Sequence, residues 1–399
     1  MTSFAFFYQS VISDWNHGNA HFLRGLMRAL QARGHSVICY EQVDNWSLAN
    51  LLTEHPSAIE EFVARFPDLR FERYEPGSGF EAWVRQRLAT VDVALVHEWN
   101  TPDVIRLLGS LCRQLGVRAL FHDTHYRVAL DDAYRASLGL DQYEAVLAYS
   151  PSVAERYRRL GFERVHVLHE AADATVFAPL PLPKMTDVVF VGNYGDGDRS
   201  EELEDYVFAP RSTVPHLTYA VYGVRYPEHV VSRLKDGLKI SYGGWVPNVL
   251  VPSVYSAARV VLHVPRRQYV DLLPGTPTIR VFEALASGAC LVSLPWQDTD
   301  HLFEIGKDYA IAHSPAEMRD LITWLCADDV ARAAFGNHGR RTILARHTCG
   351  HRADEFLRIL DASREPARSD SSASAPEKPS PSARPDGGES VEGSNAGEA

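Results

Sequence analysis

Two charged side chains stand three residues apart in an otherwise apolar stretch of the sequence between Thr278 and Ser287. Arg280 and Glu283 would project from the same face of a helix there, because residues three apart are neighbours on a helix surface. Unpaired N–H groups at a helix N-terminus favour anions, so an arginine beside them suits a diphosphate. A carboxylate one turn further on can accept both hydroxyls of a ribose. The alternative is an internal ion pair between Arg280 and Glu283 that anchors the helix.

Polar and ionisable side chains follow two predicted strands in the first half of the chain. One strand ends in His97 and Glu98, and another leads into Asp123 and His125. Such groups cost free energy at a buried strand end unless they are hydrated, paired or used. Three interpretations are open: a catalytic wall that faces a substrate, a structural polar network, or a metal site, although the spacing requires no metal. His17, in the loop after the first strand, is a further candidate base.

Glycines and an arginine lie at turns that follow two other predicted strands. Gly18 belongs to the loop after the first strand, and Gly192 and Asn193 open a similar turn in the second half. Glycine lets a backbone approach a ligand closely, although a plain tight turn would also explain Gly18. Arg199 follows the second turn at a predicted helix start, where it could clamp a phosphate or remain a solvated surface residue. The turn around Gly192 matches neither the P-loop nor the dinucleotide-binding glycine pattern.

Short β-rich runs alternate with helical patterns along the chain, which predicts parallel strands joined by crossover helices. Strands of a first sheet are expected at 4–9, 36–41, 92–97, 117–122, 144–149 and 165–169. Helices are expected at 20–33, 80–89, 102–115 and 151–160. After a proline-rich segment the alternation restarts, with strands expected at 187–191, 217–222, 238–242, 260–264, 289–294 and 309–312. The helix that carries Arg280 should end before Gly288, a residue type common just past a helix C-terminus.

The composition restricts the class of protein. The 399 residues suffice for two domains, and a hydrophobic content of 45% is normal for a globular protein. No apolar run is long enough to span a membrane and no leader pattern opens the sequence, so a cytoplasmic protein is expected. Five scattered cysteines predict buried thiols, and the net charge of −11 argues against nucleic acid as a partner. Residues 363–399 are rich in Ser, Pro, Gly and charge, which predicts a disordered tail.

Several stretches carry a resemblance to known enzymes. Residues 275–289 resemble the donor-site helix of GT-B glycosyltransferases, closest to the glycosyltransferase-like spore-maturation (CgeB-type) family. Residues 170–179, with an Asp followed shortly by Phe and Pro, are similar to the interdomain segment of family 4 glycosyltransferases. Residues 121–125 lie where those enzymes carry a histidine close to the sugar, and residues 347–352 resemble the end of the spore-maturation-type domain. The similarity extends over roughly residues 4–360.

This resemblance implies an α/β architecture of two doubly wound, Rossmann-like domains that face each other across a cleft. Residues 1–178 would form the acceptor-side domain, and residues 179–186 would form a linker. Residues 187–362 would form the nucleotide-sugar donor domain with a closing helix, followed by the tail at 363–399.

The resemblance also assigns roles position by position. Glu283 matches the glutamate that binds the nucleotide ribose, and Gly192 and Arg199 match the loop that grips the diphosphate. Gly18 matches the first-domain glycine that faces the donor. This sequence departs from family 4 at one point: those enzymes usually carry a second glutamate, which contacts sugar hydroxyls, eight positions before the ribose-binding one. Here that position is Gly275.

The expected function is therefore transfer of a sugar from a nucleoside diphosphate donor to a hydroxyl acceptor, without a metal ion or other cofactor. Arg199 and Arg280 would stabilise the departing nucleotide. Asp123 and His125 are the first candidates for an acceptor-side base, and His17 is the next. Donor contacts are expected at Gly18, Gly192, Asn193, Arg199, Arg280 and Glu283. The acceptor would be a glycan, a lipid-linked molecule or a protein, with at most peripheral membrane contact.

Two functions of other classes are open. A catalytically inactive relative could bind a nucleotide sugar during assembly of a surface structure, which would fit the missing glutamate at position 275. An epimerase with the GT-B fold would instead act on the nucleotide sugar itself and would convert free donor without an acceptor.

Overall fold

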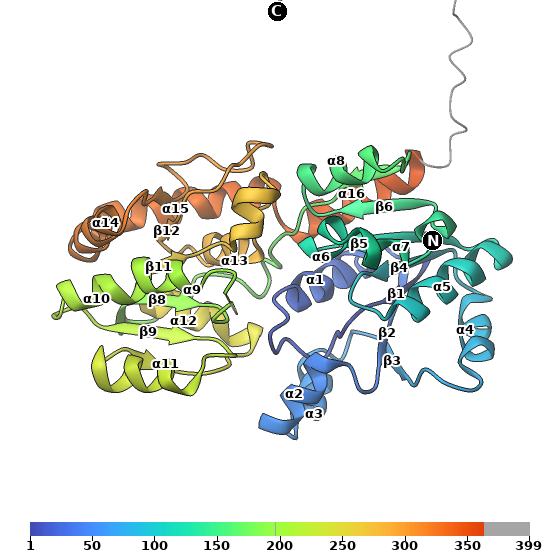
Figure 1. The fold of residues 1–399 in the computed structure, drawn as a ribbon, viewed down its shortest axis with the longest axis horizontal. Helices are drawn as coiled ribbons and strands as arrows, with labels where there is room; N and C mark the ends of the chain where they lie inside the picture. The colour runs from blue at the N-terminus through green and yellow to red at the C-terminus, as the bar shows by residue number, and fades with distance from the viewer. Residues whose placement is uncertain (196, 363–399) are drawn as a thin grey trace, which may run out of the picture. The chain divides into compact units, whose positions relative to one another are not determined.

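The computed structural model describes residues 1–195 and 197–362 and contains two parallel β-sheets (Figure 1). The predicted fold class, two doubly wound α/β domains, is confirmed. The tail that the sequence predicts to be disordered, residues 363–399, lies outside the described residues. Residues Met1–Ile359 form one compact unit that contains both sheets.

The first sheet is formed by the first half of the chain. Its strands are β1 (Ser3–Phe7), β2 (Ser36–Gln42), β3 (Phe71–Tyr74), β4 (Val93–His97), β5 (Arg118–Asp123), β6 (Ala145–Ala148) and β7 (Val165–Val167). They are ordered β3-β2-β1-β4-β5-β6-β7, and every neighbouring pair is parallel. The central strands are buried on both faces, as expected for a parallel sheet covered by helices on both sides.

Helices cover both faces of this sheet. They are α1 (Ala20–Gln31), α2 (Trp46–Glu54), α3 (Ala58–Arg65), α4 (Phe80–Leu88), α5 (Pro102–Leu115), α6 (Tyr126–Leu130), α7 (Asp132–Ala136) and α8 (Pro151–Arg159), with a 3₁₀-turn η1 (Leu140–Gln142). Apolar side chains of α4, α5 and α8 form one buried cluster with alternate strand residues such as Phe7, Val96 and Phe121.

The second sheet follows an extended, proline-rich segment. Its strands are β8 (Thr186–Val191), β9 (Tyr219–Tyr222), β10 (Ser241–Tyr242), β11 (Ala258–His263), β12 (Leu291–Ser293) and β13 (Ala310–Ile311). They are ordered β10-β9-β8-β11-β12-β13, again with every neighbouring pair parallel. Each predicted strand of this half therefore has a counterpart in the structure, although most are shorter than expected.

The helices of the second half form two buried clusters with opposite faces of this sheet. They are α9 (Ser200–Leu203), α10 (Ala209–Thr213), α11 (Glu228–Ser232), α12 (Val251–Ala257), α13 (Ile279–Ala286), α14 (Pro315–Ala327) and α15 (Asp329–Arg346), and α16 (Cys349–Ala362) follows them in the chain. Short turns join them: π-helical η2 (Glu204–Phe208), η3 (Arg233–Gly237) and η5 (Gln268–Leu272), and 3₁₀-helical η4 (Asn248–Leu250).

The chain returns to the first sheet in α16, after the second sheet is complete (Figure 1). The ring of Phe356 packs 5.7 Å from that of Phe4 in β1, and Asp354 accepts a hydrogen bond from Nε of Arg33 at 2.6 Å. The helix that the sequence assigns to the second domain therefore packs on the first sheet.

Two further expectations concern the whole chain. All five cysteines are buried and unpaired, as predicted. No helix in the described part of the chain is long and apolar enough to cross a membrane.

Candidate active site

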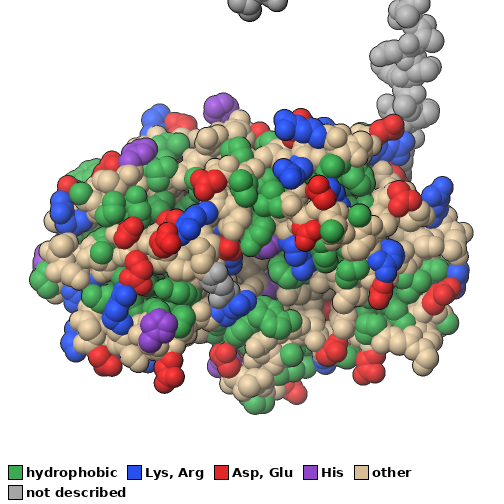
Figure 2. All heavy atoms as spheres, viewed as in Figure 1, with side chains coloured by type: hydrophobic (Ala, Val, Ile, Leu, Met, Phe, Trp, Pro, Cys, Tyr) green, Lys and Arg blue, Asp and Glu red, His purple; other side chains and the backbone are tan. Residues whose placement is uncertain are grey.

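A cavity of about 600 Å³ lies at the carboxyl ends of strands from both sheets. Its wall includes the loops that follow β1, β5 and β6 of the first sheet and β8, β9 and β11 of the second. Figure 2 shows a hollow on this face, with Lys or Arg and His side chains at its margin. Because ligands of doubly wound sheets bind beyond the carboxyl ends of the strands, this cavity is the candidate active site.

The N-terminus of α13 opens into this cavity. Thr278, Ile279 and Arg280 all line it. Thr278 precedes the helix, but its hydroxyl lies 2.8 Å from Nε2 of His263, and within the described residues its side chain caps no N–H group of α13. The N–H groups of the first turn therefore favour an anion at this end of the cavity, as the sequence predicts.

Arg280 and Glu283 form the internal ion pair that the sequence leaves open as an alternative. Arg280 is 24% exposed and lines the cavity, whereas Glu283 is 0% exposed and does not. Nη1 of Arg280 donates to Oε2 of Glu283 at 2.5 Å, and Nδ1 of His21 lies 2.9 Å from Oε1. Burial alone would raise the pKa of Glu283, but the charges of Arg280 and His21 outweigh it and hold the pKa below its ordinary value. The expectation that Glu283 faces an open cleft is wrong.

We expect Glu283→Ala to destabilise the fold. Removing one partner of a buried pair leaves the other charge unpaired, which typically costs about 3 kcal/mol or more in free energy of unfolding. Urea denaturation measures this loss. Glu304→Ala is the matched control, because Glu304 forms an exposed pair at the same spacing with Lys307 and should change stability little. A stable Glu283→Ala variant that has lost nucleotide affinity would instead support direct ribose binding.

The turn after β8 is pinned against the end of β9. A Cβ atom at Gly223, whose φ is +149°, would lie 2.0 Å from the carbonyl oxygen of Gly192, so only glycine allows this approach. Arg199 donates to the backbone carbonyl and to Oδ1 of Asn193, at 2.8 and 2.6 Å. Nδ2 of Asn193 donates to Oδ1 of Asn16 in the loop after β1, at 2.6 Å. These five residues all line the cavity. Arg199 therefore shapes the turn as well as offering a positive charge.

Gly18 and His17 reach the cavity from the loop after β1, where the sequence places them. A Cβ atom at Gly18 would lie 3.0 Å from Cγ2 of Ile279, so Gly18 allows this loop to approach the start of α13. His17 is buried, and its Nε2 has no hydrogen-bond partner among the described residues. Burial, with the charge of Arg24, lowers the pKa of His17 to about 3, which keeps the imidazole neutral.

The two predicted acceptor-side residues do not share one wall. His125 lines the cavity, whereas Asp123 is fully buried and is not part of the wall. Asp123 accepts hydrogen bonds from the hydroxyl of Tyr157 at 2.7 Å and from the backbone N–H of His125 at 3.1 Å. Asp123 therefore supports the chain beside His125, and its predicted role as a base in contact with substrate is wrong in this geometry.

Asp123 should make stability depend on pH. Burial raises its pKa to about 7, well above the value of about 3.9 in an unfolded chain. Between these values the folded state binds more protons, so the free energy of unfolding should fall as pH rises from about 4 to about 7. Asp123→Asn should reduce this fall, as measured by urea denaturation at pH 5 and pH 8. The control Asp354→Asn concerns a carboxyl whose pKa Arg33 lowers, and it should leave that fall in place. An unchanged pH profile in Asp123→Asn would contradict the assignment.

Part of the second half of the chain matches a family model in sequence. Residues 205–358 match a family model described as glycosyl transferase-like. This match includes β9 to β13 and the start of α13 with Arg280. The comparison with curated protein sequences gave no match.

Solved structures share the fold over almost the whole chain. HepE from Anabaena, in complex with UDP and glucose, is 14% identical with a TM-score of 0.66, covering 91% of this chain and 100% of that chain. Sucrose-phosphate synthase from Thermosynechococcus elongatus is also 14% identical, with a TM-score of 0.63 and coverage of 91% and 99%. A TarM mutant from S. aureus, in complex with fondaparinux, alpha-GlcNAc-glycerol and UDP, is 9% identical, with a TM-score of 0.61 and coverage of 90% and 100%. At these identities the likeness establishes the GT-B-like fold.

Four residues that line the cavity of this GT-B-like fold are not among the predicted site residues. Asp14, Glu170, Asp198 and Tyr269 all line it. Glu170 could have been found by the rule that identified the other residues, because it follows the predicted strand at 165–169 directly. Within residues 1–195 and 197–362, no group of three or more His, Cys, Asp or Glu side chains could hold a metal ion.

Proposed function

We propose that this chain is a glycosyltransferase that moves a sugar from a nucleoside diphosphate donor to a hydroxyl acceptor without a bound metal ion. The open N-terminus of α13 beside Arg280, in a cavity shared by both sheets, is the observation that carries this proposal. The glycosyl transferase-like match over residues 205–358 supports it. The finer resemblance to the spore-maturation type, and a cytoplasmic role in glycan assembly, belong to the same proposal.

The difficult step in such a transfer is departure of the nucleotide, whose diphosphate gains negative charge as the glycosidic bond breaks. Arg280 and the first N–H groups of α13 would stabilise this charge, and Arg266 lies on the same cavity wall. Arg199 would hold the turn at Gly192 and Asn193 against the diphosphate. Glu283 would act through Arg280, which it orients, rather than by touching the nucleotide.

The donor side suggests which ligands to try first. Structures of HepE contain UDP or UDP-glucose, and the TarM structure contains UDP. UDP-sugars are therefore the first donors to test, and GDP-mannose is included as a donor with a different base. The arginines at the cavity supply charge that a divalent metal would otherwise bring.

Nucleotide binding and metal independence test this proposal together. A ligand present at one hundred times its Kd stabilises the folded state by about 2.7 kcal/mol, so UDP or UDP-glucose should raise the Tm. Release of nucleotide from the bound donor should persist in excess EDTA. Loss of activity in EDTA, restored by magnesium or manganese, would contradict metal independence.

Other outcomes separate the alternative functions. Binding without turnover on any acceptor panel would indicate an inactive binding module. Conversion of the sugar without release of nucleotide would indicate an epimerase. If no nucleotide or nucleotide sugar changes the Tm, the proposed function is wrong.

A further inference from the structure

One acidic side chain of the cavity wall has an oxygen with no partner. The described wall contains three acidic residues, Asp14, Glu170 and Asp198. Asp14 accepts a hydrogen bond from Nε1 of Trp245 at 3.1 Å, and Asp198 accepts one from the hydroxyl of Tyr126 at 3.0 Å. Glu170 is 3% exposed, and its Oε1 has no hydrogen-bond partner among residues 1–195 and 197–362. A buried oxygen without a partner costs free energy, so a ligand that bonds to it would relieve that cost.

The backbone that carries Glu170 is held from two sides. Nε of Arg352 in α16 donates to the carbonyl oxygen of His169 at 2.9 Å and to that of Glu170 at 3.3 Å. The ring of His169 bonds the carbonyl oxygen of Tyr149 at 3.0 Å and a carboxylate oxygen of Asp300 at 2.8 Å. The carboxyl of Glu170 is therefore attached to a fixed point of the wall, as precise ligand binding requires.

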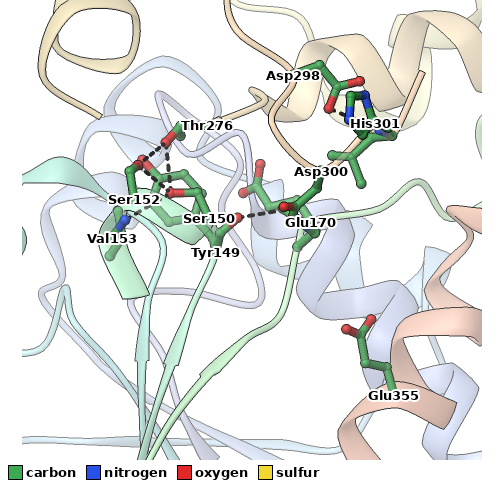
Figure 3. A network of polar contacts seen from close by, with 12 residues as sticks. Tyr149, Ser150, Ser152, Val153, Glu170, Thr276, Asp298, Asp300, His301 and Glu355 are labelled. Carbon is green, nitrogen blue, oxygen red and sulfur yellow. Dashed lines mark hydrogen bonds and ion pairs between the residues drawn. The ribbon is translucent and has the colours of Figure 1, made fainter. Parts of the chain in front are cut away.

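The loop that contains position 275 disfavours a carboxylate there. Figure 3 shows a hydroxyl network that joins Thr276 to the start of α8: Thr276 donates to Ser150 at 2.8 Å, and Ser152 lies 3.4 Å from Thr276. This network fixes the loop that contains Gly275, whose φ is +82°. A Cβ atom there would lie 2.1 Å from Oγ1 of Thr299, so a side chain at position 275 would displace that hydroxyl and would strain the backbone at this φ. With glycine at position 275, a carboxyl that contacts the sugar would come from another segment.

We propose that Glu170 binds a hydroxyl of the transferred sugar, so that the sugar subsite lies against the segment that leads from β7 to the second sheet. This inference rests on the proposed function, since it requires a nucleotide-sugar donor. Arg280 and Glu283 both act electrostatically on Glu170, which places the carboxyl near the Arg280 end of the cavity, where the diphosphate would bind. A sugar linked to that diphosphate would reach Glu170.

The protonation state of Glu170 suits a sugar hydroxyl. Burial, with the negative charge of Glu283, raises the pKa of Glu170 well above its ordinary value. Burial therefore favours the protonated carboxyl, which can both donate and accept a hydrogen bond. A sugar hydroxyl offers the complementary acceptor and donor at one atom.

Calorimetry on the full chain tests this subsite. Kd values are measured for UDP, UDP-glucose, UDP-N-acetylglucosamine and GDP-mannose with wild type, and the tightest sugar donor is kept. Glu170→Ala should weaken binding of that donor about tenfold and change the Kd of the free nucleotide less than twofold. Glu170→Gln, which nearly preserves shape, should fold and lose less. Glu163→Gln, an exposed glutamate nearby in the sequence, is the control and should change neither Kd.

Deoxy donors identify the contact. In wild type, replacing the bound sugar hydroxyl by hydrogen should raise the Kd of the donor about tenfold. In Glu170→Ala the same replacement should leave the Kd unchanged. Equal losses in both proteins at every hydroxyl, or equal weakening of nucleotide and donor by Glu170→Ala, would overturn the inference and leave the proposed function standing. Absence of wild-type binding to every nucleotide and donor would instead overturn the proposed function.

Discussion

Arg280→Ala should lower kcat for sugar transfer by about 10²- to 10³-fold, the usual cost of removing one group that stabilises transition-state charge. The KM for donor should change far less, because the negative charge on the diphosphate grows as the glycosidic bond breaks. Steady-state kinetics with saturating acceptor measures both constants. A rise in KM with unchanged kcat would show that Arg280 contributes to donor binding and not to stabilisation of the transition state.

The same substitution should also destabilise the fold, which has to be separated from its effect on chemistry. Without Arg280, His21 is the one remaining ion-pair partner of the buried Glu283 carboxylate within residues 1–195 and 197–362. The double variant Arg280→Ala/Glu283→Gln removes that charge, so it should recover most of the lost Tm. Its kcat should stay as low as that of the single variant. Recovery of kcat together with Tm would show that Arg280 acts only by supporting the fold.

Much of the fold follows from short-range sequence patterns. The buried strands β1, β4, β5 and β8 are apolar runs between helical segments, and they occur close to where the sequence predicts them. The edge strand β3 is not predicted, because its sequence Phe-Glu-Arg-Tyr has two charged residues in four and pairs only with β2. Helices α2 and α3 are also absent from the prediction, since they lie in the long connection between β2 and β3 rather than in a regular strand–helix alternation.

The site is predictable only where it depends on neighbours in the sequence. The opening of α13 toward an anion follows from its local pattern, and Gly18, Gly192 and Arg199 were found at strand ends in the same way. The burial of Glu283 could not be predicted, because it depends on His21, which lies in α1 on the other sheet. The separation of Asp123 from the cavity likewise depends on Tyr157, which is distant in sequence.

The acceptor side leads to the second large effect, at His125. This ring lines the cavity and packs against Trp99 and Tyr126, with ring centroids 5.1 and 4.2 Å away. Burial, with the charges of Arg266 and Arg127, lowers the pKa of His125 to about 3, so the imidazole is neutral and able to accept a proton. A diphosphate bound near Arg266 would offset that positive charge and make His125 more basic when the donor is in place.

His125→Ala should therefore lower transfer at saturating donor by about a hundredfold, the contribution typical of a positioned base. The Kd for nucleotide should not change, because the nucleotide would contact α13 and the turn after β8. His125→Gln keeps a polar side chain that does not titrate, so it should be equally slow and should lack the low-pH limb of the kcat profile. His17→Ala is tested in parallel, because His17 also lines the cavity and its Nε2 has no hydrogen-bond partner among the described residues. If His125→Ala transfers sugar at the wild-type rate and His17→Ala does not, the base is His17. If neither variant is impaired, neither histidine takes the proton of the acceptor, and the polar ends of β1 and β5 serve only to shape the wall.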